Sequence, residues 1–320
     1  MDAMKTKPRI TAILQASLVT FLWSTSWVLI KIGLHDNLPA ITFAGLRYML
    51  AFACLVPFVF FNPLERAELM KLSLRDWGTL ALLGVVTYTW AQSAQFLSLV
   101  YLPAAMVSLV LNLTPLFVSF SGIGFLNEHP APLQWVGVAL TVIGVGFYFL
   151  PVAIPQAQMI GILITLSCLA GNVLASLLGR GVNRDSLHSP LLITFVSMGI
   201  GSVLMLTIGI ATQGIGELSW QDWAIIAWLA AVNTALAFTI WNQTLRTLTA
   251  AESSIINSLM MPQIAILALV FLGETLTAKE IIGLVLVSAG VIAAQLKRQR
   301  VPAQVQQEAE TSCGIELRHE

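Results

Sequence analysis

The sequence predicts an all-α polytopic membrane protein, with ten transmembrane helices arranged as two inverted five-helix repeats. The first observation is composition: 57% of the 320 residues are apolar and 10% are charged, and the mean hydropathy is +0.83. So few charges cannot coat a soluble globule of this size. The second observation is a series of ten apolar stretches, and the third is a repeated phrase that divides them into two sets of five.

Each apolar stretch has the length of a helix that crosses a bilayer, because a hydrocarbon core of about 30 Å takes about 20 helical residues. The stretches are apolar on all sides, whereas the strands of a membrane β-barrel alternate apolar and polar positions. The first stretch is too long for a signal peptide and no small-residue cleavage site follows it, so we expect it to stay as the first span. In chain order, the predicted spans are 10–32, 38–61, 77–99, 102–125, 132–152, 157–179, 189–212, 223–245, 250–272 and 277–296.

An internal duplication accounts for the repeats. The phrase L-S-x-x-D-W begins at Leu72 and again at Leu218, an offset of 146 residues. In both copies the Ser and the Asp form a capping pair, so the phrase predicts the start of a helix at a membrane surface. The offset continues beyond the phrase, which is the pattern of a repeated structural unit. It joins further pairs of identical residues: Ala91 and Ala237, Ser108 and Ser254, Glu128 and Glu274, Gly137 and Gly283, and Gly144 and Gly290.

The two repeats are expected to be inverted, since a unit of five crossings delivers the chain to the opposite side before its copy begins. The charges agree: Lys71 and Arg75 in the first copy correspond to Glu217 and Gln221 in the second. Short cytoplasmic loops collect Lys and Arg, so the two copies lie on opposite sides. With the N-terminus inside, the outer loops hold Lys279 and the inner segments hold most of the other loop cations.

The predicted domain organisation follows from the duplication. The first repeat covers 10–152 and the second covers 157–296, with a cytoplasmic N-terminus at 1–9. Residues 297–320 are polar, and we expect them to form a disordered cytoplasmic tail.

This architecture is typical of secondary transporters, in which the substrate site lies near the midplane between inverted repeats. A passive channel would need a pore lined by repeated polar rings. A non-transporting scaffold or sensor would need a folded soluble domain. The sequence contains neither pattern, so transport is the leading hypothesis and the other two remain alternatives.

Specific residues also resemble a known family. The opening resembles EamA-type members of the drug/metabolite transporter superfamily in the run Leu22–Trp27, Lys31, Leu38-Pro39 and Gly45–Arg47. The end of each half resembles the close of that family's repeat, with Pro115, Glu128, Gly137 and Gly144 in the first and Pro262, Gly273, Glu274, Gly283 and Gly290 in the second. The chain departs from the pattern where Asn127 replaces a Gly and where span six lacks the Trp of span one. The resemblance implies ten helices in inverted halves, a bacterial inner membrane, and export or exchange of small metabolites.

Two cations in the first half are placed where charge is costly. Arg47 lies within span two, and an ionisable side chain in a span is a functional candidate. Its planar guanidinium suits an anion or a carboxylate. The alternatives are a bond to helix-end carbonyls or a side chain that snorkels to the outer surface. Lys31 lies at the outer end of span one, where we expect it to snorkel.

Neutral polar and aromatic residues concentrate in spans one, three and eight. We interpret them as substrate-binding candidates, because a helix that packs only against lipid has little use for them. The alternative is that they form ordinary interhelical hydrogen bonds and interfacial anchors. These candidates are Trp23, Ser24 and Trp27 in span one, Tyr88, Gln92 and Gln95 in span three, and Asn233, Trp241 and Asn242 in span eight.

Prolines predict helix breaks in spans four and nine. Pro115 and Pro262 each remove a backbone hydrogen bond, which frees carbonyl groups near positions 111 and 258. Broken helices of transporters expose such groups to ligands, although Ser or Thr side chains can also satisfy them. The neighbouring candidates are Asn112, Asn257 and Gln263. Glu128 and Glu274, in contrast, fall at helix ends, where we expect capping or loop anchoring.

Other functional classes find no support in the sequence. The four His residues are scattered outside the spans, no nucleotide-binding or nucleophile motif occurs, and the net charge is zero, so we expect no enzyme, metal site, cofactor or nucleic-acid partner. All sixteen acids lie in loops, tails or helix ends, so no proton site can be named. The expected partners are the lipid bilayer and a small-molecule substrate. Arg47 and the tryptophans favour amino acids and related metabolites, and the oligomeric state, monomer included, stays open.

Overall fold

The computed structural model describes residues 3–34, 38–114, 116–118, 132–149, 156–185, 188–244 and 256–295. Within these ranges every regular element is a helix, which confirms the all-α prediction. The tail after residue 295, together with Pro115 and Glu128, lies outside them.

The first two helices of each half are long and regular. Among the described residues they are the four helices that are long and apolar enough to cross a membrane. In the first half they are α1 (Ala3–Gly33) and α2 (Ala40–Phe60), and in the second they are α9 (Gln156–Asp185) and α10 (Pro190–Gln213).

The third predicted span of each half is a continuous helical run that changes pitch near its middle. Each run starts at the repeated phrase, where the Ser and the Asp form a complete capping box as predicted. A π-helical segment follows the first α-helical part in both halves. The runs are α4 (Leu74–Gly84), η1 (Val85–Gln92) and α5 (Ser93–Tyr101), and α11 (Trp220–Ala230), η2 (Ala231–Leu236) and α12 (Ala237–Thr244).

The last two spans of each half are shorter in the described residues. They are α6 (Ala104–Leu111) and α8 (Pro132–Phe149) in the first half, and α14 (Met260–Phe271) and α15 (Ala278–Gln295) in the second. A further short helix, α3 (Pro63–Leu69), links α2 to α4 and was not predicted. Its Pro at the first turn and the Asn62 cap explain why so short a segment is helical.

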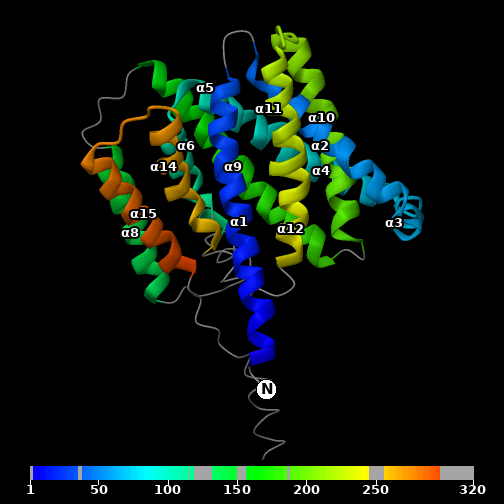
Figure 1. Cartoon of the computed structure of the whole chain (residues 1–320), viewed down its shortest axis with the longest axis horizontal. Coiled ribbons are helices and arrows are strands. Elements are labelled where there is room, and N and C mark those ends of the chain that lie inside the picture. The colour runs from blue at the N-terminus through cyan, green and yellow to red at the C-terminus, as the bar shows by residue number, and fades with distance from the viewer. Residues whose placement is uncertain are drawn as a thin grey trace, which may run out of the picture.

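Pairs of equivalent helices pack antiparallel, as inverted halves require. At one edge of the molecule α8 lies along α15 (Figure 1). Gly144 of α8 meets Gly283 of α15, while Gly290 of α15 meets Gly137 of α8. Since 137 corresponds to 283 and 144 to 290, the contact is exchanged between the halves in the manner of a two-fold axis.

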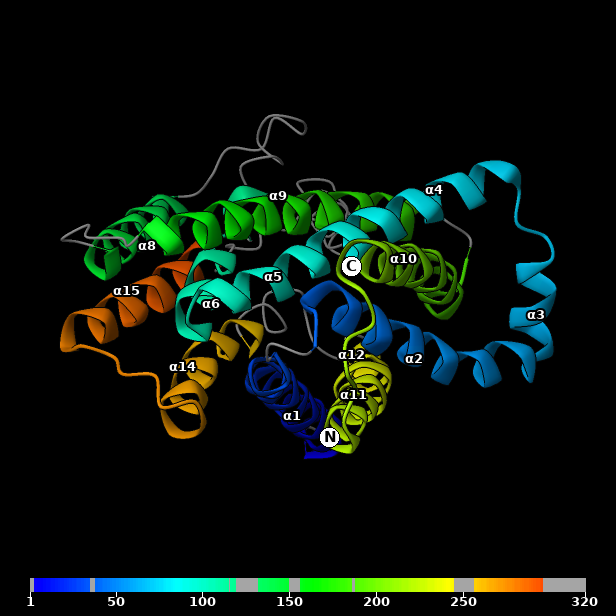
Figure 2. The same ribbon diagram turned by 90° about the horizontal axis from the view of Figure 1, so that it is seen from above.

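The two halves also interlock. From the first half, α1 lies between α14 and the α11–α12 run of the second half in both views (Figures 1 and 2). From the second half, α9 packs on η1 and α5 of the first. The first helix of each half is thus held by the opposite half, and the side chains near the middle of α1 face the second repeat.

Candidate functional site

Arg47 is buried inside the protein, with only 5% of its surface exposed. Its guanidinium donates from Nε and Nη2 to the hydroxyl of Thr234 at 3.3 and 3.2 Å. The centre of the guanidinium lies 5.2 Å from the ring of Tyr48 and 5.9 Å from the ring of Phe96. The guanidinium is bonded to a hydroxyl inside the protein. The structure therefore favours neither of the two alternatives to anion binding, a bond to helix-end carbonyls or a side chain that snorkels to the outer surface.

The partners of Arg47 are neutral. The hydroxyl of Thr234 donates a hydrogen bond to the carbonyl of Leu229, five residues earlier, at 2.8 Å, and so faces the guanidinium as an acceptor. No carboxylate of the described residues forms an ion pair with Arg47. A buried cation held by one hydroxyl and two aromatic rings retains donors that suit an anionic ligand.

The two π-segments converge on α2 at this point. Thr234 of η2 contacts Arg47, and Tyr88 of η1 lies beside Tyr48, with ring centroids 5.4 Å apart. Tyr88 and Thr234 are equivalent positions of the repeat. The dipeptide Arg47-Tyr48 therefore lies where equivalent residues of the two halves meet, which is the place expected for a site between inverted repeats.

A second group of candidates surrounds the middle of α1. Asn233, next to Thr234, donates from Nδ2 to the carbonyl of Leu22 and to the hydroxyl of Thr25, the latter at 3.1 Å. Ser24 donates to Oε1 of Gln263 on α14 at 2.9 Å. Polar groups of the second half thus hold α1 from two sides.

The tryptophan candidates separate. Trp23 packs against Trp241, with ring centroids 5.2 Å apart, and against Phe238 at 5.3 Å. This aromatic group joins α1 to α12. Trp27, one turn further along α1, is buried among apolar residues of the main core.

The remaining candidates are not brought into this group by a hydrogen bond. Asn112 bonds the carbonyl of Ser108 in its own helix at 3.2 Å. Gln92, Gln95 and Asn257 are partly buried, and no partner is described for their side chains. Pro262 lies in the first turn of α14, three residues after Leu259, which is the N-cap of this helix. Pro115 and the side chain of Asn242 lie outside the described part of the structure.

Two charged residues stabilise the corner between α5 and α6. Lys31 donates to the carbonyls of Leu99 and Leu102 at 2.5 and 2.8 Å, so the expectation that it snorkels is wrong. Glu274 accepts from the backbone N–H groups of Ala104 and Ala105 at 2.7 and 3.3 Å. The expected capping role of Glu274 is confirmed, although the capped helix is α6 of the other half.

Sequence reasoning missed several residues of the site. Tyr48 and Phe96 flank Arg47, and Thr25 holds Asn233. Each looks like an ordinary residue of an apolar span. The sequence did offer one signal for such residues: Tyr48 directly follows the candidate Arg47, and Thr234 directly follows the candidate Asn233.

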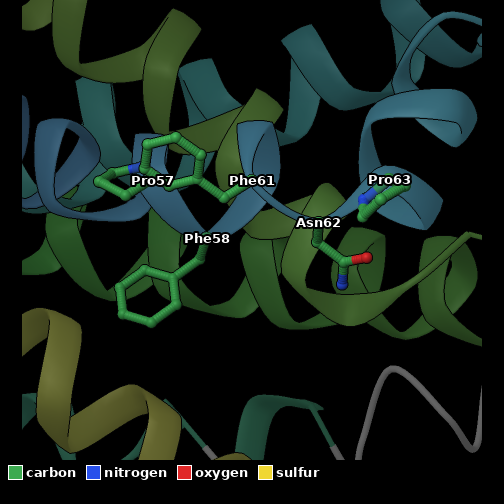
Figure 3. Close-up of a pocket in the computed structure, with 5 residues that line it drawn as sticks. All are labelled: Pro57, Phe58, Phe61, Asn62 and Pro63. Carbon is green, nitrogen blue, oxygen red and sulfur yellow. The ribbon is translucent and has the colours of Figure 1, made fainter.

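An open depression elsewhere does not belong to this site. Figure 3 shows it at the end of α2, lined by Pro57, Phe58, Phe61, Asn62 and Pro63. The amide oxygen of Asn62 is already engaged by the backbone N–H of Leu64. In the described ranges no group of three or more His, Cys, Asp or Glu side chains could hold a metal ion.

Comparisons with known proteins identify the family and the fold of the chain. The profile of the EamA-like transporter family matches residues 10–150 and 157–294. A probable amino-acid metabolite efflux pump of Salmonella typhimurium is 28% identical over 289 residues, covering 86% of this chain and 92% of its own. Its namesake from Escherichia coli is 26% identical over 86% of this chain and 92% of its own. A solved crystal structure matches with a TM-score of 0.65 and 16% identity, over 92% of this chain and 100% of that chain, and shows the same fold.

Proposed function

Since the chain belongs to the EamA-like transporter family, and so is a membrane transporter and not an enzyme, we propose that it exports or exchanges small metabolites that carry a carboxylate. Amino acids and related compounds are the first choice, because two relatives are named as probable amino-acid metabolite efflux pumps. The observation that carries the proposal is Arg47, a buried guanidinium without a carboxylate partner among the described residues.

The proposed mechanism is alternating access between the two inverted halves. Arg47 belongs to the first half, and its hydrogen-bond acceptor Thr234 belongs to the second. A rocking movement of one half against the other would change this contact directly, which suits a substrate-binding residue near the midplane. The aromatic groups around Trp23 and Tyr48 would hold the apolar part of the substrate.

We propose that the protein lies in a bacterial inner membrane with both termini in the cytoplasm. The support is the placement of Lys71 and Arg75 beside the first copy of the repeated phrase, against Glu217 and Gln221 beside the second. The similar proteins from the bacteria Salmonella typhimurium and Escherichia coli support the proposal of a bacterial membrane.

The proposal is tested with purified protein in liposomes and a substrate panel of carboxylates, amines and zwitterions. Arg47→Ala should reduce the flux of carboxylate-bearing substrates about 10- to 100-fold, because a hydrogen bond to a charged group contributes about 1.5–3 kcal/mol. Arg47→Lys retains the charge but loses the planar fork, so its flux should be intermediate.

Arg75→Ala is the matched control, since Arg75 is exposed and lies at the start of α4. Its flux should equal that of the unmodified protein. A thermal-stability measurement on each variant separates loss of transport from loss of folding. Unchanged carboxylate flux in a folded Arg47→Ala protein would show that Arg47 does not bind the substrate. Transport of amines alone would show that the substrate does not need a carboxylate.

A further inference from the structure

Two buried side-chain oxygens lack a hydrogen-bond partner among the described residues, Oγ1 of Thr87 and Oδ1 of Asn233. The two positions are 146 apart, so they are equivalent in the repeat, and each is the third residue of its π-segment. A buried polar atom without a partner costs about 1–3 kcal/mol. At Asn233, whose side chain is fully buried, such a cost within a π-segment, an element frequent at functional sites, indicates that a ligand supplies the missing partner.

The hydrogen bonds of Asn233 determine which end of its amide is available. Its Nδ2 group is engaged by the carbonyl of Leu22 and the hydroxyl of Thr25, so the free end is the oxygen, an acceptor. The residue is 0% exposed. A ligand that binds at this position must therefore offer a hydrogen-bond donor in a site closed to bulk water.

The residue with the free oxygen directly precedes the residue that holds Arg47. Thr234 follows Asn233 directly and holds Arg47, and consecutive Cα atoms are about 3.8 Å apart. The two neighbouring side chains of η2 thus differ in what they contact: Asn233 reaches α1 and keeps a free acceptor, and Thr234 contacts the guanidinium of Arg47 in α2. A zwitterion has the complementary groups, a carboxylate and an ammonium two bonds apart in an α-amino acid.

We propose that Oδ1 of Asn233 accepts a hydrogen bond from the ammonium group of the substrate whose carboxylate binds Arg47. This inference rests on the proposed function. It narrows the substrate class to α-amino acids, and the same acids without the amine should bind less tightly. An ammonium group left without this acceptor would lose part of its hydration on entering the site and regain nothing, so Asn233 determines specificity.

Thr87 does not offer the same combination. The residue after it, Tyr88, lies beside the ring of Tyr48 and not beside a cation. A hydroxyl can also act as donor or acceptor, so it does not select an ammonium group. Thr87 is therefore the matched control, a buried and unpaired oxygen at the equivalent position of the other half.

The test compares amino acids with their deaminated counterparts as competitors for transport in liposomes, for example phenylalanine with 3-phenylpropanoate and leucine with 4-methylpentanoate. The unmodified protein should prefer the amino acid. Asn233→Leu should weaken the apparent affinity for the amino acid about 10- to 100-fold and leave that for the deaminated acid unchanged. Thr87→Val should change neither affinity. Asn233→Ser replaces Asn233→Leu if the latter does not fold.

Three outcomes would overturn the inference: no preference in the unmodified protein, an equal loss for both members of a pair in the Asn233 variant, or a shifted preference in Thr87→Val. An equal loss would show that Asn233 only supports α1. These results are distinct from failure of the proposed function, in which neither acid competes and Arg47→Ala has no effect.

Discussion

Lys31 and Glu274 show how single charges stabilise the joint between α5 and α6. The cation of Lys31 meets carbonyl groups at the C-terminal end of α5, and the anion of Glu274 meets N–H groups at the N-terminal end of α6. Each charge is opposite in sign to the partial charge of the helix end that it contacts. The two side chains thus satisfy backbone groups that a helix break at Leu102 would otherwise leave unpaired.

Asp76 is the residue for which a pH effect can be predicted. Its carboxylate accepts from the hydroxyl of Ser73 at 2.6 Å and from the backbone N–H of Ser73 at 2.9 Å, and these bonds hold its pKa below the usual value. A lowered pKa stabilises the folded state above the unfolded value of about 3.9, and this contribution is lost as the pH falls through the lower folded pKa. Asp76→Asn should therefore lower the melting temperature by a constant amount between about pH 5 and 8, and the difference should shrink below about pH 4.

The measurement is a series of thermal melts of detergent-solubilised protein. His188 lies 3.5 Å from Oδ2 of Asp76 and 3.0 Å from a carboxylate oxygen of Glu68, so the series is repeated with His188→Gln to remove the contact of the imidazole with both carboxylates. A difference between Asp76→Asn and its parent that grows as the pH falls would contradict the assignment.

Among the elements, α8 and α15 depend on glycine for their close contact. A Cβ added to Gly144 would lie 2.7 Å from the backbone nitrogen of Val287 and 2.9 Å from the carbonyl oxygen of Gly283. Neither backbone atom can move without shifting α15. Helices in membranes pack through small residues for this reason, since lipid offers no hydrophobic force that would press larger residues together.

Gly144→Ala should destabilise the protein by about 1–3 kcal/mol, the usual effect of overpacking. Gly146→Ala is the matched control, because nothing lies within 4 Å of a Cβ at that position in the same helix. The control should be neutral or slightly stabilising, since Ala favours helix over Gly. Thermal melts of both variants decide the question, and equal melting temperatures would mean that the α8–α15 contact is looser than the structure shows.

The elements differ in how far the sequence could predict them. The long helices α2 and α10 start and end within a few residues of the predicted spans, because length and apolar composition determine them. The π-segments could not be predicted, because nothing in the sequence of η1, VVTYTWAQ, distinguishes a π-helical from an α-helical segment. The difference is one of backbone register, to which hydrophobic periodicity is insensitive over so few residues.

The same division applies to the candidate site. Arg47 and Asn233 could be singled out because polar groups in lipid are costly, wherever they point. Their contacts with Thr234, Thr25 and Phe96 could not be predicted, since these contacts arise only from the way the halves cross. The sequence shows that Thr234 and Tyr88 are equivalent positions of the repeat. Only the structure shows that they contact consecutive residues of α2.

At the scale of the whole molecule, the described residues keep charge away from the middle of the spans except at Arg47. The described carboxylates lie at helix ends or in loops, as Glu274 and Asp76 do. A carboxylate near the midplane is the usual proton relay of a transporter. Near the middle of the spans, the described residues of the two halves meet instead through Arg47, amides, hydroxyls and aromatic rings, groups that ordinarily keep their charge state across physiological pH.

We therefore expect transport that is not driven by protons. In liposomes with a gradient of one pH unit, a zwitterionic substrate coupled to one proton would accumulate about tenfold, since one pH unit is about 1.4 kcal/mol. For this protein the ratio of internal to external substrate should stay near one, and counterflow should persist when an ionophore collapses the gradient. A zwitterion is chosen because the membrane potential exerts no net force on it. Tenfold accumulation that disappears with the ionophore would require a proton-binding group in the transport cycle, and a central site made only of Arg47 and neutral side chains would then be incomplete.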